Sequence, residues 1–246
     1  MMPRVLPLEG ASNVRDLGGW PTEGGGSVRT GLVFRAAALS RLTGNDIATL
    51  AATGLRSVVD LRGVREAAAA PSALGDLPGV RAHHLPIEPS VGASLRDLAE
   101  TGQATGENVM DVMRRAYVAY AFDWAHRYRA LFGLLLDPGA VPLMFHCSAG
   151  KDRTGFAAAV ILTLLGVPYD AVREDYLATN RLWQADPEVA AGLPPAMASV
   201  LLSVHAELLD GAFAAIGEFG GFDRYAAVHL GIGAAEKERL RARYCG

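Results

Sequence analysis

Short runs of β-type residues alternate with helical patterns along the first part of the chain. The strand-like runs are Leu32–Arg35, Ser57–Leu61, Val80–Pro86 and Val141–Phe145, and helical patterns separate the first three at Thr43–Ala52 and Val64–Ala70. Thr43, followed three residues later by Asp46, matches an N-terminal helix cap with an acid in the first turn. Strands that alternate with helices are typical of a mainly parallel sheet covered on both faces. The sequence therefore predicts an α/β fold.

The rest of the chain is mostly helical in pattern. Aromatic residues and methionines at three- and four-residue steps predict a helical stretch over Glu107–Asp137. The apolar run Phe156–Val167 is too short to span a bilayer and predicts a buried helix, and Pro168 opens another over Tyr169–Trp183. From Ala196 onward, glycines predict the ends of helical segments at Gly211, Gly217, Gly220, Gly221 and Gly231.

Composition limits the classes of protein to which the chain can belong. Its 246 residues, half of them hydrophobic, fit one domain over 1–246 with a helical C-terminal part at about 196–246. A net charge of −3 and the lack of a basic tract argue against a nucleic-acid partner. Two cysteines are too few for a disulfide framework, and the N-terminus lacks the apolar run of a signal peptide. We expect a cytoplasmic protein without an integral membrane segment; export without a cleavable leader stays open, as does the oligomeric state.

The segment HCSAGKDRTG, residues 146–155, lies between an apolar strand and an apolar helix. Its core is Cys147, five residues, then Arg153. A loop of this length can curl so that its backbone N–H groups point at one centre, which makes an anion cradle at a helix N-terminus. Gly150 permits a backbone conformation that a side chain disfavours. We therefore expect a phosphate site, whose binding residues are Ser148, Ala149, Gly150, Lys151, Asp152 and Arg153.

Each side chain of this loop can be given a chemical task. The cradle, the helix N-terminus and Arg153 together favour Cys147 as a thiolate that attacks phosphorus. Arg153 supplies a planar, permanently charged fork for the phosphate oxygens as charge builds in the transition state. His146 orients the loop, and the Thr154 hydroxyl stabilises the thiolate when it leaves the phosphocysteine. Such a two-step mechanism requires no metal and no cofactor.

Other interpretations of the segment are weaker. A buried cysteine at a strand end with a surface arginine nearby would leave the flanking His146 and Thr154–Gly155 unexplained. A Walker-type nucleotide loop is disfavoured because its G-x-x-x-x-G-K-[ST] order is absent. A non-catalytic phosphate-binding module would not need the nucleophile, the clamp and the leaving-group helper together. A rhodanese-like sulfur transferase also uses a cysteine loop, but Thr154–Gly155 argues against it.

The segment 146–155 also resembles the active-site loop of the bacterial tyrosine and dual-specificity phosphatases of the mycobacterial protein tyrosine phosphatase B type. Motifs that resemble those of the family occur in the expected order at Asn13–Gly19, Phe34–Leu39, Val58–Arg62 with Glu66, and Glu174–Asn180. The resemblance implies a cysteine-phosphatase α/β fold that hydrolyses phosphotyrosine, with extra helices forming a lid. We expect that helical lid at about 91–129, with hinges at Gly92 and Gly102–Gly106.

The proton donor to the leaving group is less determined. Expelling a phenolate at neutral pH needs a general acid, and the Trp-Pro-Asp loop of many cysteine phosphatases is absent. Asp152 is the first candidate because it lies inside the loop beside Arg153. Asp60 is the second because it ends a strand, although pairing with Arg62 or a backbone amide is an equal alternative. Asp16 more simply fixes the N-terminal motif, and Asp123 belongs to a helical stretch.

Three further positions carry expectations. Lys151 adds positive charge that would favour phosphoinositides beside phosphotyrosine proteins as substrates; alternatively it is a solvated lysine paired with Asp152 or Glu66. His83 and His84 point to opposite faces of a strand and have a structural role rather than a metal-binding one. Cys245 is expected to be an exposed thiol.

Overall fold

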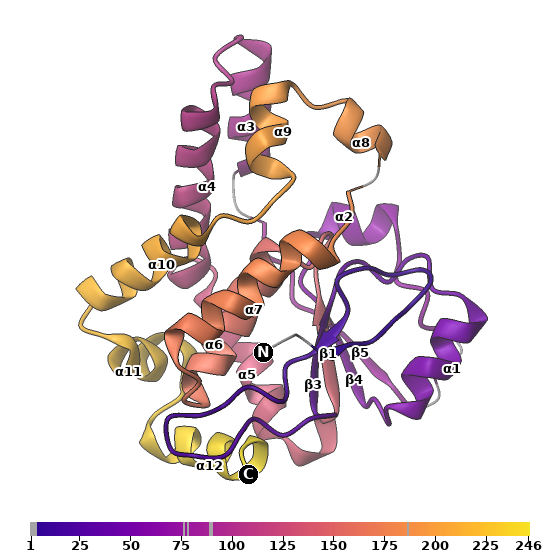
Figure 1. The fold of residues 1–246 in the computed structure, drawn as a ribbon, viewed down its shortest axis with the longest axis vertical. Coiled ribbons are helices and arrows are strands. Elements are labelled where there is room, and N and C mark those ends of the chain that lie inside the picture. Colours follow the sequence, from indigo (N-terminus) through magenta and orange to yellow (C-terminus); the bar gives the residue numbers. More distant parts are fainter. Residues whose placement is uncertain (1–3, 76, 78, 89–90, 186) are drawn as a thin grey trace.

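The computed structural model describes residues 4–75, 77, 79–88, 91–185 and 187–246, and its centre is a six-stranded sheet of order β1-β2-β3-β6-β4-β5 (Figure 1). The strands are β1 (Arg4–Val5), β2 (Arg15–Asp16), β3 (Val33–Ala36), β4 (Ser57–Asp60), β5 (Arg81–His84) and β6 (Leu143–His146). Strands β3, β6, β4 and β5 are parallel, whereas β1 and β2 add an antiparallel edge. The α/β prediction is confirmed, and β1 and β2 are the strands that it missed.

The register of the parallel strands brings their carboxyl ends to one level. Ala36 pairs with His146, His146 with Asp60, and Asp60 with His84. The loops that leave these strands therefore emerge side by side at one edge of the sheet. This is the edge at which open α/β sheets bind ligands.

Alternating side chains give the sheet two covered faces. Leu143 and Phe145 of β6 pack into the larger core with the helices that follow, whereas Met144 joins Val58 and Leu50 in a smaller core on the other face. All five side chains are at most 1% exposed. A strand buried on both faces reads as a continuous apolar run, which is why the sequence shows no alternation here.

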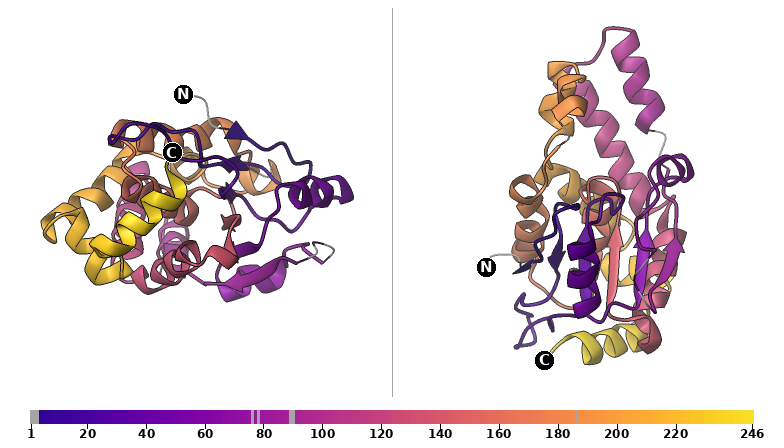
Figure 2. Two further views of the ribbon diagram at one scale, coloured as in Figure 1. Left: turned by 90° about the horizontal axis from the view of Figure 1, so that it is seen from below. Right: turned by 90° about the vertical axis from the view of Figure 1, so that its right-hand side faces the viewer.

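Helices cover both faces and extend beyond the sheet (Figures 1 and 2). They are α1 (Gly44–Ala52), α2 (Val64–Ala69), α3 (Val91–Glu100), α4 (Gly106–Ala121), α5 (Ala125–Leu136), η1 (Pro138–Ala140), α6 (Asp152–Leu164), α7 (Tyr169–Leu182), α8 (Pro187–Ala191), α9 (Pro195–Leu201), α10 (Ala206–Glu218), α11 (Phe222–Tyr225), η2 (Ala226–Leu230) and α12 (Ala234–Tyr244). No single helix in these ranges is long and apolar enough to cross a membrane, although the bent pair α9 and α10 reaches that threshold together.

Two helical predictions need correction. The stretch Glu107–Asp137 is broken after Ala121, where Phe122 turns to pack against Phe219 and Tyr225 and so redirects the chain into α5. Gly211 and Gly217 lie inside α10 and do not end it. The helices end instead at glycines that adopt positive φ, namely Gly220, Gly221 and Gly231, because this backbone conformation cannot continue a helix.

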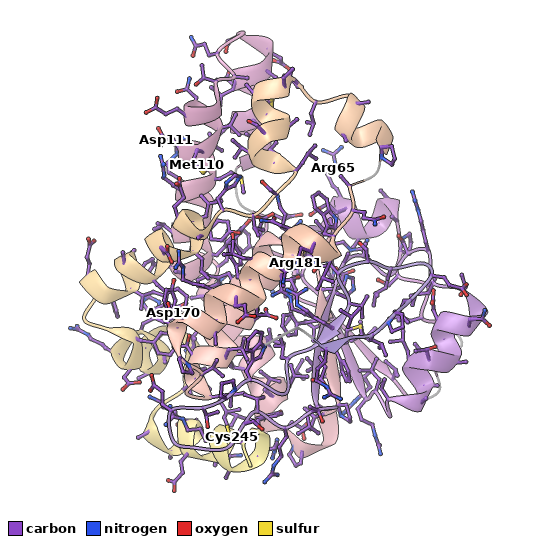
Figure 3. The ribbon with its side chains drawn as sticks, in the orientation of Figure 1. Arg65, Met110, Asp111, Asp170, Arg181 and Cys245 are labelled. Atoms are coloured by element: carbon purple, nitrogen blue, oxygen red, sulfur yellow. The ribbon has the colours of Figure 1, made fainter. Side chains whose placement is uncertain are left out.

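Helices α3, α4 and α9 form an extension that rises past the carboxyl edge of the sheet (Figures 1 and 2). In Figure 3, Met110 and Asp111 of α4 lie toward this end, whereas Cys245 lies at the opposite end. The extension contains most of the helical insertion expected at about 91–129. Gly92 lies inside α3 rather than at a hinge, whereas residues 101–105 do separate α3 from α4.

The N-terminal segment is fastened to the start of α1 by one carboxylate. Asp46, 2% exposed, accepts hydrogen bonds from the backbone N–H groups of Glu9 at 2.7 Å, Gly10 at 2.8 Å and Thr43 at 2.9 Å. The Thr43 hydroxyl in turn accepts a hydrogen bond from the N–H of Asp46 and so caps the helix, as predicted. The helix cap therefore also holds the chain that leads into β2.

Replacing Asp46 with alanine should lower the free energy of unfolding by about 1–3 kcal/mol, since three partly buried N–H groups lose their acceptor. Chemical denaturation measures the change. Asp111→Ala is the matched control, because its half-exposed ion pair with Arg114 contributes less than about 1 kcal/mol. Equal changes in the two variants would contradict the role given to Asp46.

Candidate active site

The loop 147–151 connects β6 to α6 at the carboxyl edge of the sheet. His146 is the last residue of β6, Cys147 follows it, and Asp152 is the first residue of α6. Cys147 is only 2% exposed. The predicted strand–loop–helix context of the cysteine segment is confirmed.

The carbonyl groups of this loop are bound from outside. The N–H of Ala38 donates to the Ser148 oxygen at 2.9 Å, and Asn13 Nδ2 donates to the oxygens of Ala149 at 3.1 Å and Gly150 at 2.8 Å. Arg35 Nη2 adds a second bond to the Gly150 oxygen at 2.8 Å. The backbone N–H groups of residues 148–153 donate to no other residue in the described ranges. The loop therefore keeps a set of free donors, which is what an anion cradle requires.

Gly150 is required by both conformation and space. Its φ is +62°, and a Cβ at this position would lie 2.4 Å from the carbonyl oxygen of Ala36. That oxygen belongs to the backbone at the end of β3 and cannot move aside. Only glycine lets the loop lie this close to the neighbouring strand.

A buried charge network supports the loop from below. Asp175 of α7 pairs with Arg15 Nε at 2.9 Å and with Arg35 Nη1 at 2.6 Å, and all three side chains are at most 2% exposed. Burial, and then the neighbouring Arg15, lower the pKa of Arg35 to about 10, so it stays charged at neutral pH. The two cations hold the pKa of Asp175 below its ordinary value although burial opposes this shift. Sequence reasoning found these residues only as parts of separate motifs.

Arg153 is held at the mouth of the loop by Glu66 of α2. Its Nη1 and Nη2 lie 2.6 and 2.9 Å from the two carboxylate oxygens, and Ser148 Oγ donates to the same carboxylate at 2.5 Å. Burial opposes ionisation of Glu66, but Arg153 outweighs it and lowers the pKa of Glu66 to about 2. This forked pair fixes the plane of the guanidinium. The role of Glu66 as a partner of Arg153 was not foreseen, although Glu66 stood in a recognised motif.

His146 and Asp60 lie side by side at the carboxyl ends of β6 and β4. His146 is fully buried, and burial lowers its pKa to about 4, so it is neutral 3.8 Å from Asp60 Oδ2. Its Nδ1 contacts the Cys147 carbonyl at 3.2 Å. Asp60 is bound by Arg62 at 2.6 Å, and although burial opposes it, this contact holds the pKa of Asp60 below its ordinary value. The geometry thus favours the alternative given for Asp60, a structural carboxylate paired with Arg62, over a general acid.

Asp152 and Lys151 both contact the helical extension. Asp152 Oδ1 accepts a hydrogen bond of 2.9 Å from the Tyr117 hydroxyl, and its Oδ2 lies 3.7 Å from Lys151 Nζ. Lys151 is 4% exposed, and its ammonium donates to the carbonyls of Leu201 at 2.6 Å and Ser203 at 3.0 Å. The expected pairing with Asp152 is present, but the lysine is buried rather than solvated, because the linker between α9 and α10 covers it.

The chain was compared with known proteins. The sequence profile of the family described as "Tyrosine phosphatase family" matches residues 6–246. The chain belongs to this family. A protein of Cupriavidus necator named as a tyrosine-protein phosphatase is 34% identical, covering 97% of this chain and 88% of that one. The triple specificity protein phosphatase PtpB of Mycobacterium tuberculosis is 32% identical, covering 96% of this chain and 98% of that one.

Among solved structures, the core catalytic domain of the PP-IP phosphatase SIW14 from S. cerevisiae matches with 14% sequence identity and a TM-score of 0.39. The match covers 79% of this chain and 85% of that one. The family resemblance seen in the motifs is confirmed by the sequence comparisons. The protein is a cysteine-dependent phosphatase of the tyrosine phosphatase family.

The remaining candidate residues of the phosphatase are Thr154, Asp16 and Asp123. Thr154 is fully buried, and its Oγ1 has no hydrogen-bond partner among the described residues, so its expected bond to the sulfur stays a prediction. Asp16 binds the N–H groups of Gly18 and Gly31 and fixes the N-terminal motif. Asp123 is exposed in the turn between α4 and α5.

The histidine pair and the second cysteine complete the set. His84 Nε2 contacts the Arg62 carbonyl at 2.8 Å, a structural role. Among the described residues, no group of three His, Cys, Asp or Glu side chains is placed to hold a metal ion. Cys245 is half-buried, not exposed as predicted, because its backbone forms an isolated β-bridge with Val28. Its Sγ lies 3.5 Å from the Leu165 carbonyl. Both cysteines are free.

Replacing Gly150 with alanine should lower kcat/KM for aryl phosphates by about a hundredfold, because the loop must shift away from Ala36 and misplace its donors. Phosphate release measures the loss, and weaker inhibition by orthovanadate should accompany it. The matched control is Gly54→Ala, which has a similar φ of +70° but open space around the new Cβ. That control should cost only about 1 kcal/mol of stability. Full activity of Gly150→Ala would contradict the cradle.

Proposed function

We propose that the phosphatase hydrolyses phosphotyrosine and related phosphomonoesters with Cys147 as nucleophile and Asp152 as general acid. The observation that carries this proposal is the loop around Cys147, whose carbonyls are bound outward and whose N–H groups are left free. These donors and Arg153 would receive the three phosphate oxygens that carry charge in the transition state.

The first step forms a phosphocysteine. The Cys147 thiolate attacks phosphorus, the bond from phosphorus to the leaving oxygen breaks, and Asp152 gives its proton to that oxygen. In the second step a water oxygen attacks phosphorus, the sulfur–phosphorus bond breaks, and Asp152 takes a proton from the water. Cys147 returns as a thiolate, which the buried Thr154 hydroxyl is suited to stabilise because it is an otherwise unpaired donor.

Asp152 is preferred as the acid on geometric grounds. It is the first residue of α6, directly before Arg153, and its side chain is partly accessible, whereas the Asp60 carboxylate is already bound by Arg62. The chain contains no Trp-Pro-Asp sequence, which supplies the acid from a separate loop in many cysteine phosphatases. The carboxylate of Asp152 is therefore the available group beside the phosphate cradle.

The substrate range is proposed to include phosphoesters other than phosphotyrosine. The name of the Mycobacterium tuberculosis relative, a triple specificity protein phosphatase, supports this breadth. Phosphoinositides are the second candidate class. Because Lys151 is bound by the carbonyls of Leu201 and Ser203, a second substrate phosphate would have to draw it away from the linker.

The nucleophile is tested by Cys147→Ser, which should abolish release of inorganic phosphate from every substrate, since a serine hydroxyl is not ionised at neutral pH. Release is measured across a panel of phosphotyrosine, phosphoserine and phosphoinositide substrates, which also ranks the substrate classes for the unaltered protein. Activity that survives in Cys147→Ser would contradict the proposed function.

Replacing Asp152 with asparagine should lower kcat for phosphotyrosine by about a hundredfold or more, the usual worth of a general acid. The loss should be much smaller for an aryl phosphate whose leaving group needs no proton. Steady-state kinetics with the two substrates measures the difference. Equal losses on both would remove Asp152 from the acid role.

A further inference from the structure

One oxygen of the Asp152 carboxylate is already occupied. Oδ1 accepts the hydroxyl hydrogen of Tyr117 at 2.9 Å, and Tyr117 belongs to α4, 35 residues earlier in the sequence. The other oxygen, Oδ2, accepts no hydrogen bond from the described residues and forms an ion pair with Lys151 Nζ at 3.7 Å. The carboxylate is thus held by one oxygen and leaves the other available.

Tyr117 is itself rigidly placed. Its side chain is fully buried, its hydroxyl lies 2.6 Å from that of Tyr176, and the two rings meet edge to face. Since the Tyr117 hydrogen is donated to Asp152, its hydroxyl oxygen is free to accept the hydrogen of Tyr176, whose hydroxyl also lies 3.5 Å from the His205 carbonyl oxygen. Burial, and then the Asp152 carboxylate, raise the pKa of Tyr117 well above its ordinary value, so it keeps its proton.

The three residues that make these contacts come from different parts of the fold. Tyr117 lies on α4 of the extension, Tyr176 on α7 beneath it, and Asp152 at the start of α6. Apolar packing of α4 with its neighbours would hold the helix without any hydroxyl. A tyrosine at position 117, with its polar end directed at the loop, therefore does something that a phenylalanine would not.

We propose that Tyr117 is a positioning residue for the general acid: it fixes Asp152 through Oδ1 so that Oδ2 carries the proton to the leaving oxygen. This inference rests on the proposed function and deepens it. The Oδ2–H bond breaks as the leaving oxygen gains its proton, and Oδ2 takes a proton from water in the second step. The O–H bond of Tyr117 stays intact throughout. Helix α4 thereby takes part in the chemistry.

The test compares the unaltered phosphatase with Tyr117→Phe, Asp152→Asn and the double variant. Each is assayed with phosphotyrosine and with an aryl phosphate of low leaving-group pKa. Tyr117→Phe should lower kcat for phosphotyrosine about tenfold, as expected for a misplaced catalytic group, and for the activated ester less than about twofold. In the Asp152→Asn background the same substitution should cause no further loss, because the group that it positions is gone.

A merely structural role gives a different pattern. Equal losses on the two substrates, or losses that add in the double variant, would overturn the inference. If Asp152→Asn shows the selective loss and Tyr117→Phe behaves like the unaltered protein, this inference fails while the proposed function stands. If Asp152→Asn itself shows equal losses on the two substrates, the assignment of Asp152 as the acid fails, and this inference fails as well.

Two further variants guard against a loss of folding. Tyr244 lies on α12, and its equally buried hydroxyl donates to the Leu135 carbonyl at 2.7 Å. Tyr244→Phe removes this hydroxyl and should leave both activities unchanged. Tyr176→Phe keeps the bond from Tyr117 to Asp152 but removes its support, so it should give a smaller selective loss. Thermal unfolding and the rate of Cys147 alkylation by iodoacetamide report whether the loop is intact in each variant. No selective loss in Tyr176→Phe, together with an unfolded Tyr117→Phe, would also count against the proposal.

Discussion

The outward binding of the loop carbonyls is the interaction on which the rest of this phosphatase depends. A chain reversal with free N–H groups in its centre is unfavourable unless its carbonyls are satisfied elsewhere. Here Asn13 and Arg35 supply that satisfaction, and Asp175 neutralises Arg35 from α7. The cradle therefore exists before any phosphate arrives, which is what preorganised stabilisation of a transition state requires.

This arrangement links the site to the fold. Burying Arg15, Arg35 and Asp175 together is costly, and removing Asp175 would leave two arginines without their shared carboxylate in the core. The three residues lie on β2, β3 and α7, so the network forms only when this pair of neighbouring strands and the helix are in place. The contacts that shape the loop thus also stabilise the fold, and Asp152 adds a further one through Tyr117 on α4.

Much of the fold and the strand–loop–helix context of Cys147 could be predicted from the sequence. The four parallel strands, the helix after Cys147 and the position of Gly150 follow from hydrophobic pattern and loop chemistry. The contacts that aim the side chains could not, because they join residues far apart in the chain. Lys151 looked solvated by its type, yet the linker after α9 buries it, and Tyr117 looked like one more core aromatic until its hydroxyl was placed beside Asp152. Pattern alone also missed the break after Ala121, since neither glycine nor proline marks it.

The contacts that shape the loop are made to its main chain. Asn13 and Arg35 bind the carbonyls of Ala149 and Gly150, and Lys151 binds those of Leu201 and Ser203. Recognition of this kind does not depend on the side chain at the accepting position. During divergence, Ala149, Leu201 and Ser203 are thus free to change identity while the site keeps its shape. Drift is instead restrained at the donors, so the signature of this site in evolution should include scattered polar positions such as Asn13 and Arg35 as well as the loop itself.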